Sequence, residues 1–326
     1  MEDKIFSVSD QNFESLALQI FHFQYTNNPV YQSWVRTLGI DPTTVNSIFK
    51  IPFLPISFFK THKVITTDFQ PAAIFESSGT TGETPSRHYV KSMRLYETSF
   101  LTTFDRFYGP PNQYVILGLL PSYLERQNSS LIAMVDALIK KSGNLASGFY
   151  LHNHTELEQT LVECSNKQQP VILIGVTFAL LDFAAERGMS LPNTIILETG
   201  GMKGRREEIT REEVHAILKN KLGVSAIHSE YGMTELLSQA YSQKDGIFNT
   251  APWMRILLRD EEDPLSIKSP GTFSRTRGVI NVIDLANIYS CAFIATDDLG
   301  SVTTKGFTVD GRLDSSELRG CSLLTL

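Results

Sequence analysis

The sequence predicts an α/β fold in which a parallel sheet carries helices on both faces and a smaller β-rich part follows. Between residues 113 and 228, short apolar runs alternate with amphipathic stretches. Because parallel strands need a long crossover connection, this alternation predicts right-handed βαβ units. The apolar runs are continuous, as expected of strands that are buried on both faces. After residue 246 the pattern changes to strand-like runs separated by turn residues, which predicts the β-rich part.

The individual elements follow from these patterns in chain order. Hydrophobic residues from Phe13 to Phe23 recur at helical spacing and predict a first helix. Buried strands are expected at 114–120, 148–151, 170–175, 194–197 and 225–228. The helices between them are expected at 129–141, 155–167, 178–187 and 207–222, and later strands at 256–258, 278–285 and 291–295. Open sheets of this kind bind ligands at the carboxyl ends of their strands, so the loops there are the candidate site.

The length of 326 residues fits one large domain or two medium ones. We expect a single domain, 1–326, and divide it by pattern into four segments. These are a helical segment with a polar loop (1–112), the α/β body (113–245), the β-rich part (residues 246–310) and a C-terminal tail (311–326).

Composition excludes several classes of protein. The net charge of −6 argues against nucleic-acid binding and against a polybasic membrane-surface protein. The longest apolar run, 114–120, is far shorter than the roughly 18 residues of a membrane span, and the N-terminus lacks a signal-peptide core. Three distant cysteines, Cys164, Cys291 and Cys321, give neither a disulfide framework nor a CxxC zinc motif. We therefore expect a cytoplasmic protein without a membrane span.

The most distinctive segment is the hydroxyl-rich loop 76–87, ESSGTTGETPSR. Its glycines allow close backbone approach, and its N–H and O–H groups can surround a polyphosphate. The loop lacks the GK[ST] ending of a Walker P-loop. On composition alone, a polar surface loop is an equal alternative. The candidate phosphate-binding residues are Ser77, Ser78, Gly79, Thr80, Thr81 and Gly82.

Two further segments follow predicted strands of the sheet. In 228–235, HSEYGMTE, the Thr234 hydroxyl can reach a phosphate, and the Glu235 carboxylate can hold Mg²⁺, which prefers oxygen ligands. The turn Thr199-Gly200-Gly201 would let a ligand ring lie on the backbone. The alternatives are an ordinary loop with a paired glutamate and a simple turn before the next helix.

The last segments lie in the C-terminal quarter of the chain. They are 295–300 (ATDDLG), for which an Asx turn is the alternative, and 311–314 (GRLD).

Cys321 follows in a polar tail, and a thiol that attacks an activated acyl group forms a thioester. Cys321 is seven positions after Asp314, a span of at most roughly 25 Å. Taken alone, an inert terminal cysteine would be the ordinary interpretation. We expect Cys164 and Cys291 to be packed, because they lie on a predicted helix and a predicted strand.

In combination these segments resemble the signatures of the adenylate-forming enzymes, which include acyl- and aryl-CoA ligases, luciferases and adenylation domains. SSGTTGxP resembles their phosphate-binding signature, YGMTE their YGxTE, ATDDLG their TGDLG, and GRLD their GRxD. Ser86 stands where the family usually has Lys, and Asp297 replaces the usual Gly. The segments HSEYGMTELLSQAYS and RGCSL further resemble the acyl-protein synthetases of bacterial luminescence systems, the LuxE-like branch.

The resemblance implies ATP and Mg²⁺ as cofactors and a role for each matched residue. Tyr231 would stack on adenine together with the turn 199–201, Thr234 would contact the α-phosphate, and Glu235 would bind Mg²⁺. Asp298 would bind the ribose, and Arg312 the ribose or a phosphate. The remaining nucleotide-binding candidates are the flanking residues Glu230 and Gly232.

The function implied is the activation of a carboxylic acid, of fatty type, to an acyl-adenylate. The acyl group would pass to Cys321 and then to a partner protein, a reductase or a carrier. The resemblance to the LuxE-like branch implies that the family's mobile C-terminal domain, which carries a catalytic Lys, is not required, and we expect this chain to function without it. An acyl- or aryl-CoA ligase and a catalytically reduced nucleotide-binding module remain as alternatives. The acyl pocket is expected near Gly175-Val176-Thr177, at the end of a predicted strand.

Overall fold

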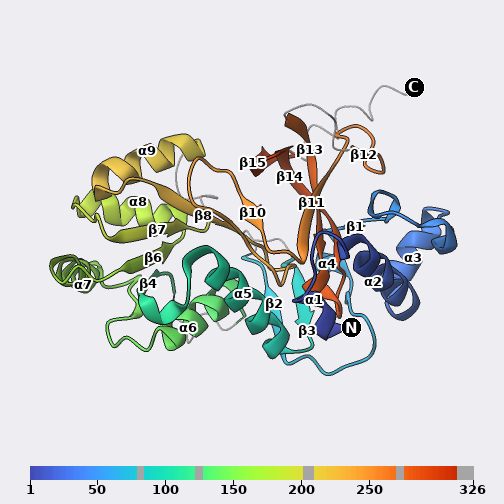
Figure 1. The fold of residues 1–326 in the computed structure, drawn as a ribbon, viewed down its shortest axis with the longest axis horizontal. Helices are drawn as coiled ribbons and strands as arrows, with labels where there is room; N and C mark the ends of the chain where they lie inside the picture. The colour runs from blue at the N-terminus through green and yellow to red at the C-terminus, as the bar shows by residue number, and fades with distance from the viewer. Residues whose placement is uncertain (79–83, 122–127, 201–208, 269–274, 314–326) are drawn as a thin grey trace. The chain divides into compact units, whose positions relative to one another are not determined.

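A computed structural model describes residues 1–78, 84–121, 128–200, 209–268 and 275–313 (Figure 1). The chain forms two compact units. The first comprises Met1–Phe58, Val64–Thr67 and the chain from Pro252 on, and the second comprises Phe59–Lys63 and Asp68–Ala251. The predicted helical segment, residues 1–112, is thus divided between the units. Within the described ranges, no helix has both the length and the apolar character that crossing a membrane requires.

The second unit is built on a seven-stranded sheet in the order β10-β9-β8-β7-β6-β4-β5. The strands from β8 to β5 are parallel, whereas β9 and β10 are antiparallel to their neighbours. The strands are β4 (Val115–Leu119), β5 (Gly148–Phe149), β6 (Val171–Gly175), β7 (Thr194–Glu198), β8 (Ile227–Tyr231), β9 (Ala240–Ser242) and β10 (Asn249–Thr250). A separate hairpin pairs β2 (Ala73–Glu76) with β3 (Arg87–Val90).

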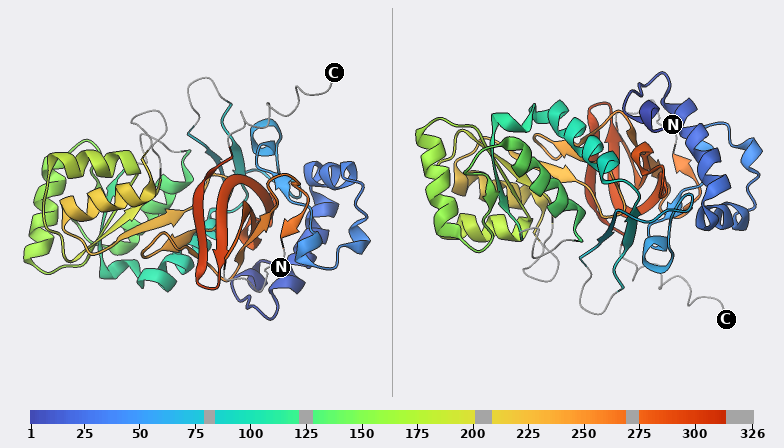
Figure 2. Two further views of the ribbon diagram at one scale, coloured as in Figure 1. Left: turned by 90° about the horizontal axis from the view of Figure 1, so that it is seen from above. Right: turned by 90° about the horizontal axis from the view of Figure 1, so that it is seen from below.

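Helices cover both faces of this sheet, as Figure 2 shows. Because side chains alternate across a strand, Leu117 and Leu173 face one side and join the core beneath α7, α8 and α9. On the other side Gly118 lies against Val135 of α6, where an added Cβ would be 3.4 Å from the valine side chain. The helices are α5 (Met93–Tyr108), α6 (Ser130–Ser142), α7 (His154–Asn166), α8 (Thr177–Glu186) and α9 (Arg211–Leu222). The predicted parallel sheet with helices on both faces is confirmed.

Two boundaries near the candidate site differ from the prediction. Strand β8 continues to Tyr231, three residues beyond the predicted end, because the chain there still pairs with β9. Helix α9 begins at Arg211 instead of 207. Thr210 caps it through a capping box, in which its hydroxyl accepts from the Glu213 N–H and the Glu213 carboxylate accepts from the Thr210 N–H.

The first unit contains the predicted β-rich part, a sheet in the order β1-β14-β13-β11-β12 with β15 paired to β14. All its pairs are antiparallel except β1–β14. The strands are β1 (Leu54–Pro55), β11 (Met254–Arg259), β12 (Ile267–Lys268), β13 (Arg275–Asp284), β14 (Phe293–Thr303) and β15 (Gly306–Arg312). The strand expected at 291–295 continues to Thr303, so the segment 295–300 lies within a strand and not in a turn.

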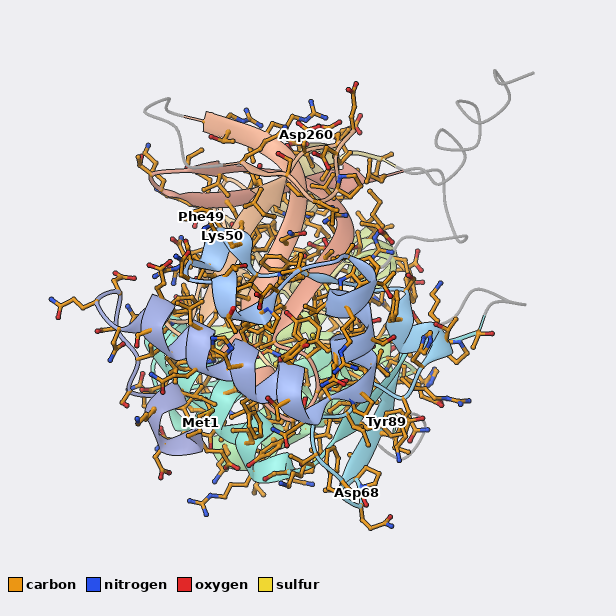
Figure 3. All side chains as sticks on the ribbon, turned by 90° about the vertical axis from the view of Figure 1, so that its right-hand side faces the viewer. Met1, Phe49, Lys50, Asp68, Tyr89 and Asp260 are labelled. Atoms are coloured by element: carbon orange, nitrogen blue, oxygen red, sulfur yellow. The ribbon has the colours of Figure 1, made fainter. Side chains whose placement is uncertain are left out.

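Helices of the N-terminal segment pack onto this sheet, and Figure 3 looks onto α2 with the strands behind it. Phe21 of α2 contacts Phe293 with ring centroids 6.3 Å apart. Buried Gln24 donates to the carbonyls of Asn287 and Ile288 and accepts from the Ala292 N–H, so its amide is satisfied and ties the helix to the sheet. The remaining helices are α1 (Glu2–Ile5), α2 (Phe13–Asn27), α3 (Pro29–Thr37), α4 (Phe58–Thr61) and the 3₁₀ turns Pro42–Thr44, Ile48–Lys50, Pro111–Gln113 and Leu285–Asn287.

Candidate active site

The carboxyl ends of β6 and β7 are joined by a set of hydrogen bonds around Glu198. The Thr177 hydroxyl and the Gly200 N–H, the latter at 2.8 Å, both donate to Glu198 Oε1. The Thr177 N–H donates to the Gly200 carbonyl at 2.9 Å, and the Thr199 N–H donates to the Gly175 carbonyl at 3.0 Å. Gly200 has a φ of +77°, a left-handed conformation that favours glycine. Thr199-Gly200, the described part of the predicted ring-binding turn, and the predicted acyl-pocket segment are therefore one hydrogen-bonded structure.

The neighbouring strand β8 leads directly into the segment expected to carry the chemistry. Tyr231 ends the strand, and its ring contacts Phe248 with centroids 6.0 Å apart. Gly232 follows, where a Cβ would overlap Glu230 Oε1, so only glycine lets that carboxyl lie against the turn. The Leu236 N–H donates to the Met233 carbonyl at 3.1 Å, and Glu235 within this turn is 5% exposed.

The carboxyl group of Glu230 is kept largely neutral at pH 7. Burial raises its pKa to about 8, and the negative charge of Glu198 on the adjacent strand contributes in the same direction. A protonated carboxyl can donate a hydrogen bond and does not repel an anion. In this form Glu230 repels a phosphate-bearing ligand less than an ionised carboxylate would.

Stability provides a test of this protonation state. The unfolded chain has an ordinary glutamate pKa near 4.5, so the folded state binds more protons between about pH 4.5 and 8. The free energy of unfolding should fall as the pH rises through this window, by about 1.4 kcal/mol for each pKa unit as an upper limit. We expect Glu230→Gln to remove this loss, so that the variant is more stable than the wild type at pH 9 but not at pH 4.5.

Urea denaturation at the two pH values measures the difference. Glu97→Gln, which changes an exposed glutamate on α5, is the matched control and should follow the wild type at both. An equal effect of Glu230→Gln at pH 4.5 and pH 9 would show that the carboxyl titrates normally.

The hydroxyl-rich loop begins and ends on the β2–β3 hairpin. The Ser77 N–H donates to the Ser86 carbonyl at 3.1 Å, and the Ser86 N–H donates to the Ser77 hydroxyl at 2.9 Å. One residue further out, Arg87 Nε lies 3.1 Å from Glu76 Oε1 in an ion pair. The buried Ser86, at the position where the related signature has Lys, therefore closes the base of the loop. Ser78 is exposed just inside the base.

His88 connects this hairpin to the turn that contains Thr234. Its Nδ1 lies 2.8 Å from the Thr234 carbonyl oxygen, and because a carbonyl only accepts, the imidazole is the donor. The side chain is 1% exposed, and its ring meets Phe59 edge to face at 5.9 Å. The sequence prediction missed this residue. A histidine in the strand sequence RHYV, next to the hydroxyl-rich loop, is the signal that was available.

In the first unit, β14 and β15 bring the other two motifs together. Their register places Asp298 opposite Arg312, and Arg312 Nε lies 2.9 Å from Asp298 Oδ1. The Asp298 side chain is buried, whereas Asp297 is exposed and its carbonyl accepts from the Leu313 N–H at 2.8 Å. Asp298 and Arg312 therefore act as one ion-paired unit at this end of the sheet.

The buried Arg259 holds the segment before Asp298 in place. Its guanidinium donates to Asn281 Oδ1 at 2.6 Å and to the carbonyls of Ile280 and Thr296. The Thr296 hydroxyl in turn accepts from the Asp298 N–H at 3.1 Å. Burial lowers the pKa of Arg259, and the Asp297 carboxylate opposes that shift. This network fixes the backbone from which the Asp298 side chain projects.

The different environments of the two aspartates give a prediction. We expect Asp298→Ala to weaken ATP binding by about 1.5–3 kcal/mol, the range for hydrogen bonds to a charged group, and to release Arg312 as well. Asp297→Ala, which removes an exposed carboxylate next door, is the matched control and should change the affinity far less. Calorimetric titration with ATP compares the two variants. The reverse ranking would place the nucleotide-binding carboxylate one residue earlier.

Six candidate residues remain, together with the two cysteines that were expected to be packed. Gly79, Thr80, Thr81, Gly82, Gly201 and Cys321 lie outside the described residues. Cys164 and Cys291 are buried, and burial raises the pKa of both thiols, that of Cys291 to about 12. A thiolate is the nucleophilic form of cysteine, so neither of these residues is suited to attack an acyl group at neutral pH.

A magnesium ion fits the donor set only as part of a nucleotide complex. In the described part of the chain no group of three or more His, Cys, Asp or Glu side chains could hold a metal. Mg²⁺ bound to substrate phosphates takes only one or two protein carboxylates. Glu235, in the turn beside Thr234, supplies one carboxylate of the required kind.

No profile of a known protein family matches the sequence. Among curated proteins the chain is similar to a long-chain-fatty-acid–luciferin-component ligase of Aliivibrio fischeri, with 21% identity over 341 residues. The alignment covers 95% of this chain and 86% of that protein. The resemblance to the LuxE-like branch, stated from the motifs, is thereby confirmed.

Solved structures of 2-hydroxyisobutyryl-CoA ligase share the fold. An open conformation in complex with 2-HIB-AMP and CoA superposes with a TM-score of 0.61 at 11% identity, over 92% of this chain and 74% of that one. A postadenylation state with R3-HIB-AMP gives 0.65 at 12% identity, over 94% and 68%. The chain therefore has the fold of the adenylate-forming ligases, as predicted.

Proposed function

We propose that the protein activates a carboxylic acid with ATP and Mg²⁺ to give an acyl-adenylate and pyrophosphate. In this reaction a carboxylate oxygen attacks the α-phosphorus, and the bond between that phosphorus and the pyrophosphate oxygen breaks. Catalysis of such a step is mainly positioning and stabilisation of charge on phosphate.

One observation carries the proposal. Three segments from distant parts of the chain converge in the second unit, through His88 to Thr234 and through the β7–β8 pairing of Glu198 with Ser229. They are the loop based on Ser77 and Ser86, the turn Thr199-Gly200, and the segment from Glu230 to Glu235. The resemblance to the adenylate-forming enzymes implies that all three segments bind the nucleotide.

The residues of these segments divide the work by their chemistry. The hydroxyl and N–H groups of the loop donate to phosphate oxygens, the Thr234 hydroxyl donates to the α-phosphate, and Glu235 holds Mg²⁺ against the phosphates. Tyr231 and the turn Thr199-Gly200 receive the adenine. Asp298 binds the ribose, with Arg312 orienting its carboxylate through their ion pair.

We further propose that the acid is a fatty acid and that the acyl group passes to Cys321. The name of the Aliivibrio fischeri relative, a long-chain-fatty-acid ligase, supports the substrate class. The buried state of Cys164 and Cys291 supports Cys321 as the acceptor. In this step the thiolate attacks the acyl carbon, a C–S bond forms, and AMP leaves with the C–O bonding pair. A reductase or a carrier protein is the expected final acceptor.

The experiment that tests the first step is ATP–pyrophosphate exchange. Purified protein with Mg²⁺, ATP, labelled pyrophosphate and a panel of fatty, hydroxy and aromatic acids should exchange label only in the presence of an accepted acid. Exchange with none of the acids, despite measurable ATP binding, would favour a nucleotide-binding module. Rapid formation of acyl-CoA on addition of CoA, as for the structural neighbour crystallised with CoA, would favour a CoA ligase.

A further inference from the structure

The hydrogen bond from His88 to Thr234 spans 146 residues of sequence and joins two segments that the proposed function uses separately. His88 lies on β3, directly after the hydroxyl-rich loop, and is paired with Phe75 on β2. Thr234 lies in the turn between β8 and β9. The bond therefore links the base of the phosphate loop directly to the turn that carries Thr234 and Glu235.

We infer that His88 is a positioning residue, which through its Nδ1–H holds the Thr234–Glu235 turn against the β2–β3 hairpin, at the base of the hydroxyl-rich loop. The inference rests on the proposed adenylation function. The hydrogen-bond partner of His88 is the Thr234 main chain, so His88 acts by fixing where the Thr234 hydroxyl and the neighbouring Glu235 carboxylate point. Phe59 packs edge to face against the imidazole at 5.9 Å and helps to fix the plane of the ring, while the hydrogen bond to the carbonyl fixes which edge of the ring faces Thr234.

The choice of histidine over an apolar residue has a physical reason. The Thr234 carbonyl accepts from a side chain that is 1% exposed, and a buried imidazole N–H without an acceptor is costly, so the bond satisfies the ring as well as holding the turn. Burial lowers the pKa of His88 to about 4, so the ring is neutral throughout the physiological range. A neutral donor fixes the turn without adding a positive charge that would compete with Mg²⁺ for the Glu235 carboxylate.

Three substitutions separate positioning from packing. His88→Leu keeps an apolar side chain but removes the donor, His88→Asn retains a donor at the position of Nδ1, and His88→Gln places its donor one bond further out. We expect His88→Leu and His88→Gln to lower kcat for pyrophosphate exchange by roughly 10-fold, the effect of about 1.4 kcal/mol. His88→Asn should retain activity within about 3-fold of the wild type, and the KM for the acid should change little in all three. His22→Leu, which changes an exposed histidine on α2, is the matched control and should exchange pyrophosphate at the wild-type rate.

Hydrogen–deuterium exchange tests the same inference without any activity. Peptides covering 231–239 should exchange roughly 10-fold faster in His88→Leu than in the wild type and recover in His88→Asn. If the Leu and Asn variants behave alike in both measurements, His88 serves packing alone and the inference fails. If the wild type shows no pyrophosphate exchange but the variants differ in deuterium exchange as expected, the proposed function is rejected. The role of His88 in positioning the Thr234–Glu235 turn then still stands.

Discussion

Glu235→Gln is expected to lower acid-dependent ATP–pyrophosphate exchange by about 100-fold or more, the scale of removing one preorganised electrostatic element. The amide has nearly the same shape as the carboxylate but carries no negative charge to hold Mg²⁺ against the phosphates. Glu235 is 5% exposed in a turn anchored by the His88–Thr234 hydrogen bond, so the substituted side chain should stay in place. The measurement is the exchange rate at saturating acid over a series of Mg²⁺ concentrations.

Two comparisons make the result specific. Glu97→Gln, on the exposed face of α5, has the same chemistry and should exchange at the wild-type rate. Circular dichroism and the melting temperature should show Glu235→Gln to be folded. Wild-type exchange in a folded Glu235→Gln protein would remove the metal-binding assignment, and the carboxylate would then have to come from elsewhere in the site.

The central sheet could be predicted closely because its strands are defined by their own sequence. Strands β4, β6 and β7 lie within one residue of the runs predicted at 114–120, 170–175 and 194–197. Each is a continuous apolar run between turn signals, which is the pattern of a strand covered on both faces. Local sequence was therefore sufficient for the layer that positions the site.

The elements that the prediction missed depend on partners far away in the chain. The hairpin β2–β3 reads AIFE and RHYV, too short and too polar for a periodic signal, and forms by pairing across the hydroxyl-rich loop. Strand β14 continues through charged residues to Thr303 because β13 and β15 pair with it on both sides. Tertiary pairing determines strand length in such cases.

The same limit applies to the site. Motif matching indicated Tyr231, Thr234, Glu235, Asp298 and Arg312, but it treated each segment alone. The hydrogen bond from His88 to Thr234, the ion pair of Arg312 with Asp298, and the electrostatic effect of Glu198 on Glu230 join residues that no spacing rule connects. Sequence motifs predict which residues contact a ligand. The residues that position those ligand-contacting residues are found only from the folded structure.

The cysteines allow the second large effect to be predicted. Cys164 lies on α7 with its side chain in the core between the helices and the sheet, and Cys291 precedes β14 with its thiol pKa raised to about 12 by burial. Leu313, the last described residue, is anchored by the hydrogen bond from its N–H to the Asp297 carbonyl. Cys321 is eight positions after Leu313 in the sequence, a span of at most roughly 29 Å. Cys321 is therefore tethered to the strand pair that carries the proposed ribose-binding aspartate.

Incubation with Mg²⁺, ATP and a labelled fatty acid should leave a hydroxylamine-sensitive label on the peptide that contains Cys321. Cys321→Ser should abolish this thioester label, because serine at neutral pH is a far weaker nucleophile than a thiolate. The same variant should retain pyrophosphate exchange, since adenylation precedes acyl capture. Cys164→Ser and Cys291→Ser are the matched controls and should keep the label wherever the variant folds. A label on the peptide that contains Cys164 or Cys291, or loss of pyrophosphate exchange in a folded Cys321→Ser protein, would contradict Cys321 as the acyl acceptor. If no peptide is labelled while acyl-CoA forms rapidly, CoA is the acceptor.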